Sequence, residues 1–383
     1  MSGRARLPRV AEALERGRAA GLHSAAVACV DRGAAGGLLE VAVGEAPPGA
    51  AMSGDRPMLW MSMSKPITAM AIALLWQRGE VDLEAPVARY IPTFAQRDKG
   101  SITVLHLLTH TAGLRASPFN YPQDDWDTII AKVSAQRVEP GWVVGEDAGY
   151  HVHGAWFILG EIVRRVSDVT LPTFLRRELL EPLGMTRSWV GMSEQAFDAE
   201  GDRVCPVYDT SGESPVQQPF TQREWLTGVR PGGNGVGPVS ELTAFYRAML
   251  DTLLGRRISP WSAETVARFV GRERRDTHDK TFKHVMDWGL GVMVNSSHHG
   301  AESVPYGFGL GASDETFGHG GYQSSIVFAD PPRDLVVAVV CNGFPGDAAH
   351  HRRMAEVLQA VERDLATLDK ASGDMAPSAE LSA

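Results

Sequence analysis

Apolar positions spaced three and four residues apart predict helices in several parts of the chain. The clearest pattern lies between residues 67 and 75, where apolar side chains recur at i, i+3, i+4, i+7 and i+8, as on one face of a half-buried helix. Pro66 falls in the first turn of this helix, where an N–H would have no helical partner, and Gly79 ends it. Further helices are expected at residues 9–18, 156–167, 241–254 and 348–368.

Short apolar runs bounded by turn residues predict strands near both ends of the chain. Residues 25–30 and 38–43 flank a glycine-rich turn, and residues 325–329 and 335–341 flank the turn Asp-Pro-Pro-Arg-Asp. Because helices lie between these pairs, we expect an α+β fold: one antiparallel sheet flanked by helices, plus an inserted mainly helical domain. The predicted sheet domain comprises residues 1–90 and 285–370, the insert 91–284, and a disordered tail 371–383.

Composition adds few functional constraints. The 383 residues, 44% of them hydrophobic, are enough for one large or two smaller domains. The net charge is −9 and the basic residues form no long run, so we expect no nucleic-acid partner. The N-terminal segment has no apolar core of a signal peptide, and the longest apolar run, 67–76, is too short to span a bilayer. We therefore expect a cytoplasmic protein that does not associate with membranes.

Cysteine and histidine usage gives no sign of a metal centre. Cys29, Cys205 and Cys341 are too few and too scattered for a disulfide framework, so we interpret them as buried thiols. There is no His-Glu-x-x-His motif and no Cys/His cluster with zinc-ligand spacing. We therefore expect neither a metal nor an organic cofactor. The paired histidines at 298–299 and 350–351 are interpreted as solvated loop or helix-end residues.

A candidate nucleophile lies at the start of the predicted helix at 67–75. Ser62 and Lys65 are three residues apart, which places both side chains on one helical face. A buried lysine with a lowered pKa can take the proton of a serine hydroxyl. Ser-x-x-Lys alone is a weak signal, since it arises by chance in many helices. Two observations strengthen it: only six lysines occur among 37 basic residues, and the rival Gly-x-Ser-x-Gly motif is absent.

The sequence from Ser62 to Ala69 resembles the nucleophile motif of the serine β-lactamase and penicillin-binding-protein superfamily. It is most similar to the class C-like branch, which includes family VIII carboxylesterases, lovastatin-type acyltransferases and D-stereospecific peptidases. Residues 79–92 and 102–114 are similar to further stretches of that branch, so the resemblance covers nearly the whole chain. It implies a β-lactamase/transpeptidase-like fold with the active site in the groove between the two domains.

The resemblance also implies roles for two later motifs. Tyr150 matches the tyrosine that carries protons between the nucleophile and the leaving group. His319, Gly320 and Gly321, followed by Tyr322, match the strand that lies along the substrate. The backbone N–H groups of Ser62 and Tyr322 would then form the oxyanion hole. Outside this context, Tyr150 would be interpreted as a buried tyrosine with a satisfied hydroxyl. The loop at 230–235 is expected, again by resemblance, to border the cleft.

The sequence departs from the lactamase pattern at two positions. Val152 stands where those enzymes carry an asparagine, and His319 replaces the lysine of their Lys-Thr-Gly strand. Both changes remove groups that hold a peptide-like, anionic substrate, so a neutral ester is favoured over a β-lactam. His151 is a candidate substrate contact, although a structural hydrogen bond explains it equally well, and His153 is interpreted as structural.

The expected activity is acyl transfer through an acyl-enzyme at Ser62, with a small-molecule ester, thioester or amide as substrate. Four alternatives remain open at this stage: a carboxylesterase, a cytosolic transacylase of specialised metabolism, a β-lactamase or D,D-peptidase, and a non-catalytic binding protein on the same scaffold. The sequence leaves the oligomeric state open.

Overall fold

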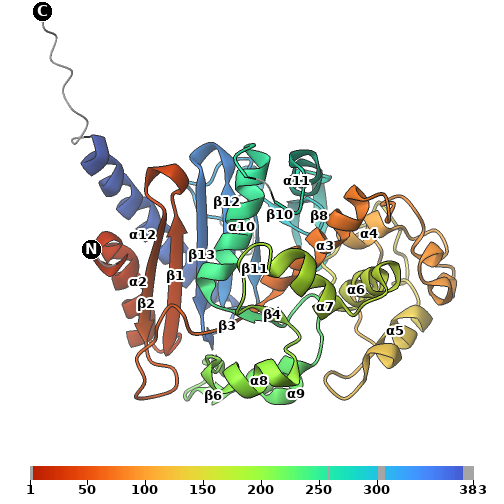
Figure 1. Ribbon diagram of the computed structural model, residues 1–383, viewed down its shortest axis with the longest axis horizontal. Coiled ribbons are helices and arrows are strands. Elements are labelled where there is room, and N and C mark those ends of the chain that lie inside the picture. The colour runs from red at the N-terminus through yellow and green to blue at the C-terminus, as the bar shows by residue number, and fades with distance from the viewer. Residues whose placement is uncertain (1–2, 258, 301–306, 374–383) are drawn as a thin grey trace, which may run out of the picture.

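The computed structural model describes residues 3–257, 259–300 and 307–373. Its centre is an eight-stranded sheet in which every neighbouring pair is antiparallel, with the order β2-β1-β13-β12-β11-β10-β9-β8 (Figure 1). The strands are β1 (Ala25–Asp31), β2 (Leu38–Gly44), β8 (Arg274–Asp279), β9 (His284–Trp288), β10 (Met293–Val294), β11 (Phe317–Gly321), β12 (Ser325–Asp330) and β13 (Leu335–Cys341). The two predicted strand pairs from the ends of the chain are adjacent, which confirms the predicted fold class.

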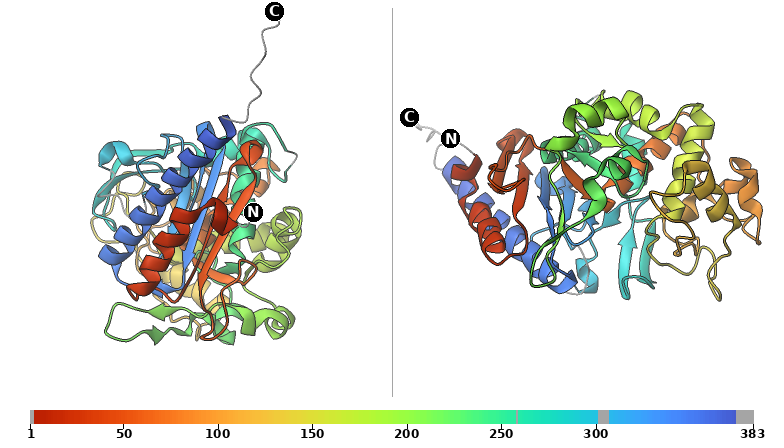
Figure 2. Two further views of the ribbon diagram at one scale, coloured as in Figure 1. Left: turned by 90° about the vertical axis from the view of Figure 1, so that its left-hand side faces the viewer. Right: turned by 90° about the horizontal axis from the view of Figure 1, so that it is seen from below.

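Helices cover both faces of this sheet. Helices α2 (Pro8–Ala19) and α12 (Asp347–Gly373) pack side by side on one face (Figure 2), and α10 (Val239–Leu253) contacts β1, β12 and β13 on the other. Alternate residues of β1 therefore enter two different cores: Val27 packs in the core that includes α10, and Ala28 in the core that includes α2 and α12.

The helical region lies beside the far edge of the sheet. It contains α3 (Lys65–Gln77), α4 (Val104–Leu108), α5 (Trp126–Ala135), α6 (Gly154–Ser167), α7 (Leu171–Leu175) and α11 (Ala263–Val270). Helix α3 packs against α6, α7 and α11 as well as β11. Every residue from Lys65 to Leu75 is buried, so the prediction of a half-buried helix is wrong. A helix that is apolar all round belongs in a core, and here the second face contacts the inserted helices.

The remaining elements are short. Two three-stranded sheets have the orders β3-β7-β4 and β14-β5-β6. Their strands are β3 (Met58–Met61), β4 (Trp189–Val190), β5 (Tyr208–Asp209), β6 (Val216–Gln217), β7 (Gly235–Gly237) and β14 (Gly343–Phe344), and the short helices are α1 (Gly3–Arg6), α8 (Glu194–Glu200) and α9 (Arg223–Thr227).

The division of the chain is less sharp than the sequence suggested. Helix α10 and strand β8 both precede residue 285, yet both pack in or on the large sheet. Residues 371–373 of the predicted tail continue α12, and the rest of that tail lies outside the described residues. Cys29, Cys205 and Cys341 are buried free thiols, as predicted.

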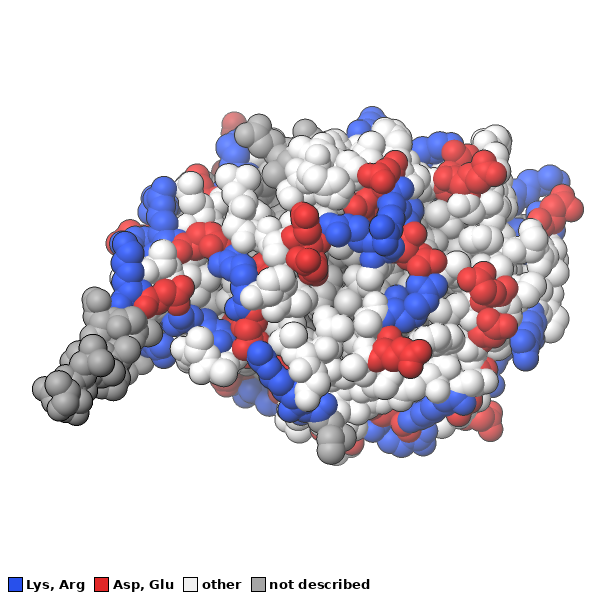
Figure 3. Space-filling view, turned by 90° about the horizontal axis from the view of Figure 1, so that it is seen from above, with Lys and Arg blue, Asp and Glu red and all other residues white. Residues whose placement is uncertain are grey.

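Charges of both signs are mixed on one face of the molecule, where lysines and arginines are interspersed with acidic residues (Figure 3). Among the described residues, no helix is both long enough and apolar enough to cross a membrane.

Candidate active site

Ser62 lies at a strained junction between a strand and a helix. Strand β3 ends at Met61, whose φ of 52° and ψ of −134° lie outside the usual regions for a residue with a side chain. A 3₁₀ turn, Ser62–Ser64, then leads into α3. Ser64 stabilises this turn: its Oγ donates to the Met61 carbonyl at 2.6 Å and accepts from the Gly235 N–H at 2.7 Å. Ser64 is therefore occupied structurally, and Ser62 is left facing the cleft.

Lys65 is placed as a base for Ser62. Its Nζ lies 3.0 Å from Ser62 Oγ and donates to the Gly232 carbonyl at 2.7 Å. The side chain is fully buried, and burial lowers the pKa of Lys65 well below its ordinary value, with the charge of Arg230 adding to the effect. No acid pairs with Lys65 among the described residues to reverse this. The amine is therefore suited to accept the Ser62 proton.

Tyr150 lies against the same lysine. Lys65 Nζ is 5.0 Å from the centre of the Tyr150 ring, which also packs on Phe282 and Trp288 at centroid distances of 5.0 and 5.7 Å. The backbone N–H of Tyr150 donates to the buried Asp279 carboxylate at 3.1 Å. Strand β8 therefore fixes the position of a tyrosine that lies over a hundred residues earlier in the chain.

The third motif forms the opposite wall of the cleft on β11. His319 Nδ1 donates to the Gly320 carbonyl at 2.6 Å, which leaves Nε2 without the proton. Burial, with a contribution from Lys65, lowers the pKa of His319 to about 3, so its imidazole is neutral. A Cβ on Gly321 would lie 2.8 Å from the Trp60 carbonyl oxygen. Glycine at 321 therefore allows β11 to approach the end of β3 next to Ser62.

Together these residues line a cleft of about 480 Å³. Of the candidate site residues, Ser62, Tyr150, His319, Gly320 and Tyr322 line it and Gly321 does not, and the loop at 230–235 contributes Arg230, Gly232 and Gly233. Ser62 and Tyr322, whose N–H groups are the candidate oxyanion donors, therefore border the same space. The other walls are mainly apolar and aromatic: Met61, Val152, Phe220, Trp225 and Phe282.

His151 lies outside the cleft lining. It is fully buried; its Nε2 accepts from the Leu114 N–H at 2.8 Å, and its Nδ1 lies 3.3 Å from His110 Nδ1. Because both ring nitrogens are engaged inside the protein, the hypothesis that His151 contacts substrate is wrong, and the structural alternative holds. His153 instead lines the cleft, where its Nε2 accepts from Arg230 Nη2 at 2.8 Å.

Several cleft residues were missed in the sequence. Phe220, Trp225 and Asp347 come from segments far from any recognised motif, and only the folded chain brings them together. Arg230 belongs to the loop at 230–235 that was expected to border the cleft, but its stacking on Tyr121 and Trp225 was not predicted. No pattern in the sequence singled out Asp279 as the anchor of Tyr150.

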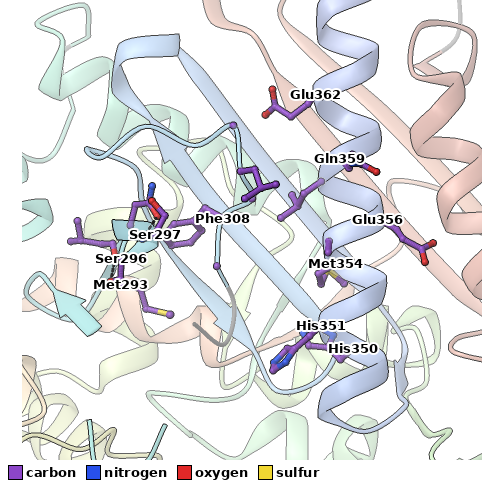
Figure 4. Close-up of a pocket in the computed structure, with 18 residues that line it drawn as sticks. Met293, Ser296, Ser297, Phe308, His350, His351, Met354, Glu356, Gln359 and Glu362 are labelled. Carbon is purple, nitrogen blue, oxygen red and sulfur yellow. Dashed lines mark hydrogen bonds between the residues drawn. The ribbon is translucent and has the colours of Figure 1, made fainter. Parts of the chain in front are cut away.

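A second cavity of about 500 Å³ lies away from these residues, between α12 and β10 (Figure 4). Met354 of α12 lies across it from Met293 and Phe308. His350 and His351 also line it, and His350 is 1% exposed, so the prediction that this residue is solvated is wrong. Among the described residues that line this cavity, none has the hydrogen-bonded pair of hydroxyl and amine found at Ser62 and Lys65, so the cleft at Ser62 is the candidate active site.

Comparisons with known proteins agree with this fold and cleft. Residues 10–362 match the model of the Beta-lactamase family, so the chain belongs to that family. "Esterase/beta-lactamase LipL" of Mycobacterium tuberculosis is 26% identical over 324 residues, which cover 76% of this chain and 70% of LipL. Family members include esterases, carboxypeptidases and β-lactamases, which are serine hydrolases.

Two solved structures show the same architecture. A penicillin-binding protein homologue from Caulobacter crescentus has a TM-score of 0.78 and 27% identity, covering 94% of this chain and 97% of that one. A family VIII carboxylesterase has a TM-score of 0.77 and 23% identity, with coverage of 94% and 97%. The resemblance inferred from the motifs and the β-lactamase/transpeptidase fold are both confirmed.

Proposed function

We propose that this protein is a serine acyl-transfer enzyme that forms an acyl-enzyme at Ser62 and acts most readily on esters. The observation that carries the proposal is the fully buried Lys65 amine, 3.0 Å from Ser62 Oγ and with a strongly lowered pKa. A fully buried lysine with a lowered pKa does not serve as a surface charge, and its amine can act as the base that a serine hydroxyl needs.

The proposed reaction has two steps. Ser62 Oγ attacks the carbonyl carbon while its proton passes to Lys65 Nζ, and the N–H groups of Ser62 and Tyr322 stabilise the oxyanion. As the ester bond breaks, Tyr150 donates its phenolic proton to the oxygen of the departing alcohol and takes up the proton held by Lys65, so both groups end this step as they began it. The second step reverses this path, with water or another nucleophile attacking the acyl-enzyme and Ser62 regaining its proton.

An ester is favoured by the chemistry of the cleft walls. The neutral His319 stands where lactamases carry a lysine, and Val152 stands where they carry an amide. The aromatic walls suit an apolar acyl or alcohol group. LipL carries both an esterase and a β-lactamase name, and β-lactam cleavage is the second candidate activity.

Ester turnover and adduct formation test the proposal. We expect Ser62→Ala to abolish hydrolysis of 4-nitrophenyl butyrate and to remove the mass adduct that a fluorophosphonate forms on the wild type. Ser211→Ala is the matched control, because Ser211 is exposed and lies outside the cleft lining. Turnover by Ser62→Ala at the wild-type rate would show the mechanism to be wrong.

The same assay separates hydrolysis from transfer. Faster release of nitrophenol with an added amine, together with the amide product, identifies a transacylase. A rate that is unchanged by amines identifies a carboxylesterase. If neither esters nor the probe reacts with the wild type, the scaffold is a binding protein and the proposal fails.

A further inference from the structure

A cation in the cleft has no acidic partner. Arg230 lines the cleft with Ser62, and its guanidinium lies over the rings of Tyr121 and Trp225, at 4.7 and 5.1 Å from their centres. Its Nη2 donates to His153 Nε2, and its buried Nε has no acceptor. Among the described residues, no carboxylate lies within ion-pairing distance of it. One of its five N–H groups is therefore bonded to a neutral imidazole, and the other four are not bonded to protein.

Three arginines that are buried more completely than Arg230 have partners inside the protein. Arg274 pairs with Asp279 at 3.0 Å, and Arg247 pairs with Asp334 at 2.6 Å. Arg353 has no acid partner, but its two Nη atoms donate to three backbone carbonyls. Withdrawing a cation from water without compensation is unfavourable. An anion entering the cleft would supply that compensation.

We propose that Arg230 is an anion-binding subsite of the cleft and that it takes the carboxylate of a substrate whose remaining body is apolar. This inference rests on the proposed function and changes its substrate class. The cation that His319 does not supply comes instead from the opposite loop, so the expectation of a neutral ester is revised to an ester bearing a carboxylate.

The charge and shape of the subsite favour a carboxylate over a phosphate. A planar guanidinium binds a carboxylate through two parallel hydrogen bonds. One cation balances a monoanion, whereas the second charge of a phosphate dianion would meet no further lysine or arginine among the described residues that line the cleft. Tyr121 and Trp225 hold the guanidinium in place before the ligand arrives, which reduces the loss of side-chain freedom on binding.

A matched pair of esters tests the subsite in the wild-type enzyme. The 4-nitrophenyl monoester of glutaric acid ends in a carboxylate, and its methyl-capped form is neutral. We expect kcat/KM to be about 10- to 100-fold higher for the carboxylate ester, mainly through KM. Arg230→Gln should reduce this ratio to about 1, and Arg230→Lys should keep part of it. The ratio cancels any effect of Arg230 on Lys65, because both esters react with the same nucleophile.

Arg223→Gln is the control, because Arg223 is exposed and pairs with Glu194 and Asp198 outside the cleft lining. It should retain the wild-type ratio. A wild-type ratio near 1, or an unchanged ratio in Arg230→Gln, would overturn the inference. A stronger effect with a phosphate-bearing ester than with the carboxylate would overturn the choice of carboxylate.

A binding measurement separates this inference from the proposed function. In Ser62→Ala, glutarate monomethyl ester should bind by calorimetry, and the neutral dimethyl ester should bind at least tenfold more weakly. Arg230→Gln in the same background should remove the difference. If this pattern appears while the wild type hydrolyses no ester, the subsite stands and the proposed activity falls. If esters react but the anion binds no better, the subsite falls alone.

A separate cluster of side chains has the geometry of a metal site. Asp276 of β8, Asp287 of β9 and the adjacent His298 and His299 bring four ligand atoms within 4.8 Å of one another. His298 Nε2 lies 3.4 Å from Asp287 Oδ2, and His299 Nε2 lies 3.3 Å from Asp287 Oδ1 and 3.4 Å from Asp276 Oδ1. Ligands about 2.0–2.1 Å from a tetrahedral ion are about 3.3 Å apart, and each of these three His–Asp separations is close to that distance.

We infer that these four residues bind a zinc-type divalent cation, contrary to the expectation of no metal. The carboxylate of Asp287 is already oriented, because Oδ2 pairs with Arg272 at 3.0 Å and Oδ1 accepts from the Asp276 N–H at 2.9 Å. Two carboxylates and the Arg272 guanidinium leave one net negative charge beside the two imidazoles. A bound ion would link β8 and β9 to the turn after β10.

Calorimetry on chelator-treated protein tests this site. We expect one zinc ion per chain with a Kd below about 10 μM, a rise in Tm, and no binding of magnesium, which prefers oxygen ligands. The double variant His298→Ala/His299→Ala should lose zinc binding. His278→Ala, which changes an exposed histidine of β8 outside the cluster, should keep it. No zinc binding by the wild type, or equal binding by the double variant, would overturn the inference.

Discussion

The buried ion pair of Arg274 and Asp279 tests how the fold holds Tyr150. Asp279 Oδ2 pairs with Arg274 Nη2 at 3.0 Å. Its Oδ1 accepts from the backbone N–H groups of Tyr150, Thr281 and Phe282 at 3.1, 2.9 and 3.1 Å. Asp279→Ala removes all four interactions at once. It leaves a buried guanidinium without a counter-charge, next to the loop that carries the candidate proton carrier.

The expected loss can be worked out from these contacts. Removing one partner of a buried ion pair costs about 3–5 kcal/mol, and each buried N–H left unpaired costs about 1–3 kcal/mol. Because these costs overlap at one site, we expect Asp279→Ala to lower the free energy of unfolding by about 4 kcal/mol or more. Asp279→Asn keeps an oxygen for the three N–H groups but not the charge, so it should cost about 3 kcal/mol.

Urea unfolding followed by circular dichroism measures the loss, and ester kinetics below the unfolding transition measure its effect on the site. We expect kcat to fall while KM changes little, since Tyr150 is the proposed proton carrier of the reaction. Combining Arg274→Met with Asp279→Asn should recover part of the stability, because no unpaired charge remains. Asp198→Asn, in an exposed pair with Arg223, should cost less than about 0.5 kcal/mol. An Asp279→Ala enzyme within 1 kcal/mol of wild type would refute the reasoning, as would a destabilised enzyme with normal kcat.

Three further predictions concern the cleft. Lys65→Met should lower kcat by about three orders of magnitude, yet raise stability at pH 7 by more than about 1 kcal/mol. Folding lowers the pKa of Lys65, so the free energy of unfolding of the wild type should rise as the pH rises toward the pKa of an exposed lysine, and that of Lys65→Met should not. If urea unfolding shows the same dependence of stability on pH for both proteins, the prediction is contradicted. Gly321→Ala places a Cβ 2.8 Å from the Trp60 carbonyl oxygen, so kcat should fall at least about tenfold with little change in KM, and unchanged kinetics would show that β11 can move. The pKa of His319 is lowered to about 3, so His319 should not change its charge between pH 5 and 9. The pH profile of kcat/KM should therefore have the same shape in His319→Asn as in the wild type. A change in rate near pH 6.5 that is present in the wild type and absent from His319→Asn would contradict a neutral imidazole.

The parts of the fold with strong local periodicity could be predicted. Strands β1, β2, β12 and β13 consist of apolar residues, either in an unbroken run or alternating with polar ones, and each pair is joined by a clear turn. Strand β8 reads Arg-Arg-Asp-Thr-His-Asp, and β11 reads Phe-Gly-His-Gly-Gly, so neither carries a strand pattern of its own. Both strands owe their conformation to pairing with neighbours, and pairing between distant segments is invisible in a local pattern.

In the candidate site, too, only the residues that are close in the sequence could be placed together from a local pattern. Ser62 and Lys65 are three residues apart on one turn, so their proximity follows from helical geometry alone. Tyr150 and His319 were found through their motifs, but the partner of His153, Arg230, is 77 residues away and could not be identified from the sequence. Contacts of that kind are set by tertiary packing, and the sequence does not record them locally.

Strand β8, which has no strand pattern in the sequence, also positions Tyr150 in the candidate site. Ala148 forms a parallel bridge with Asp279, and the Lys280 N–H donates to the Ala148 carbonyl at 2.9 Å, so the Tyr150 loop lies along the edge of β8. Ser62 begins the 3₁₀ turn before α3 and Lys65 is the first residue of α3, and both the turn and the helix contact β11. The proposed nucleophile and base are therefore fixed through β11, and the proposed proton carrier through β8, three strands away in the same sheet. Loosening β8 should then separate Tyr150 from Lys65 without moving Ser62, which is why a loss in kcat, and not in KM, is the expected signature of Asp279→Ala.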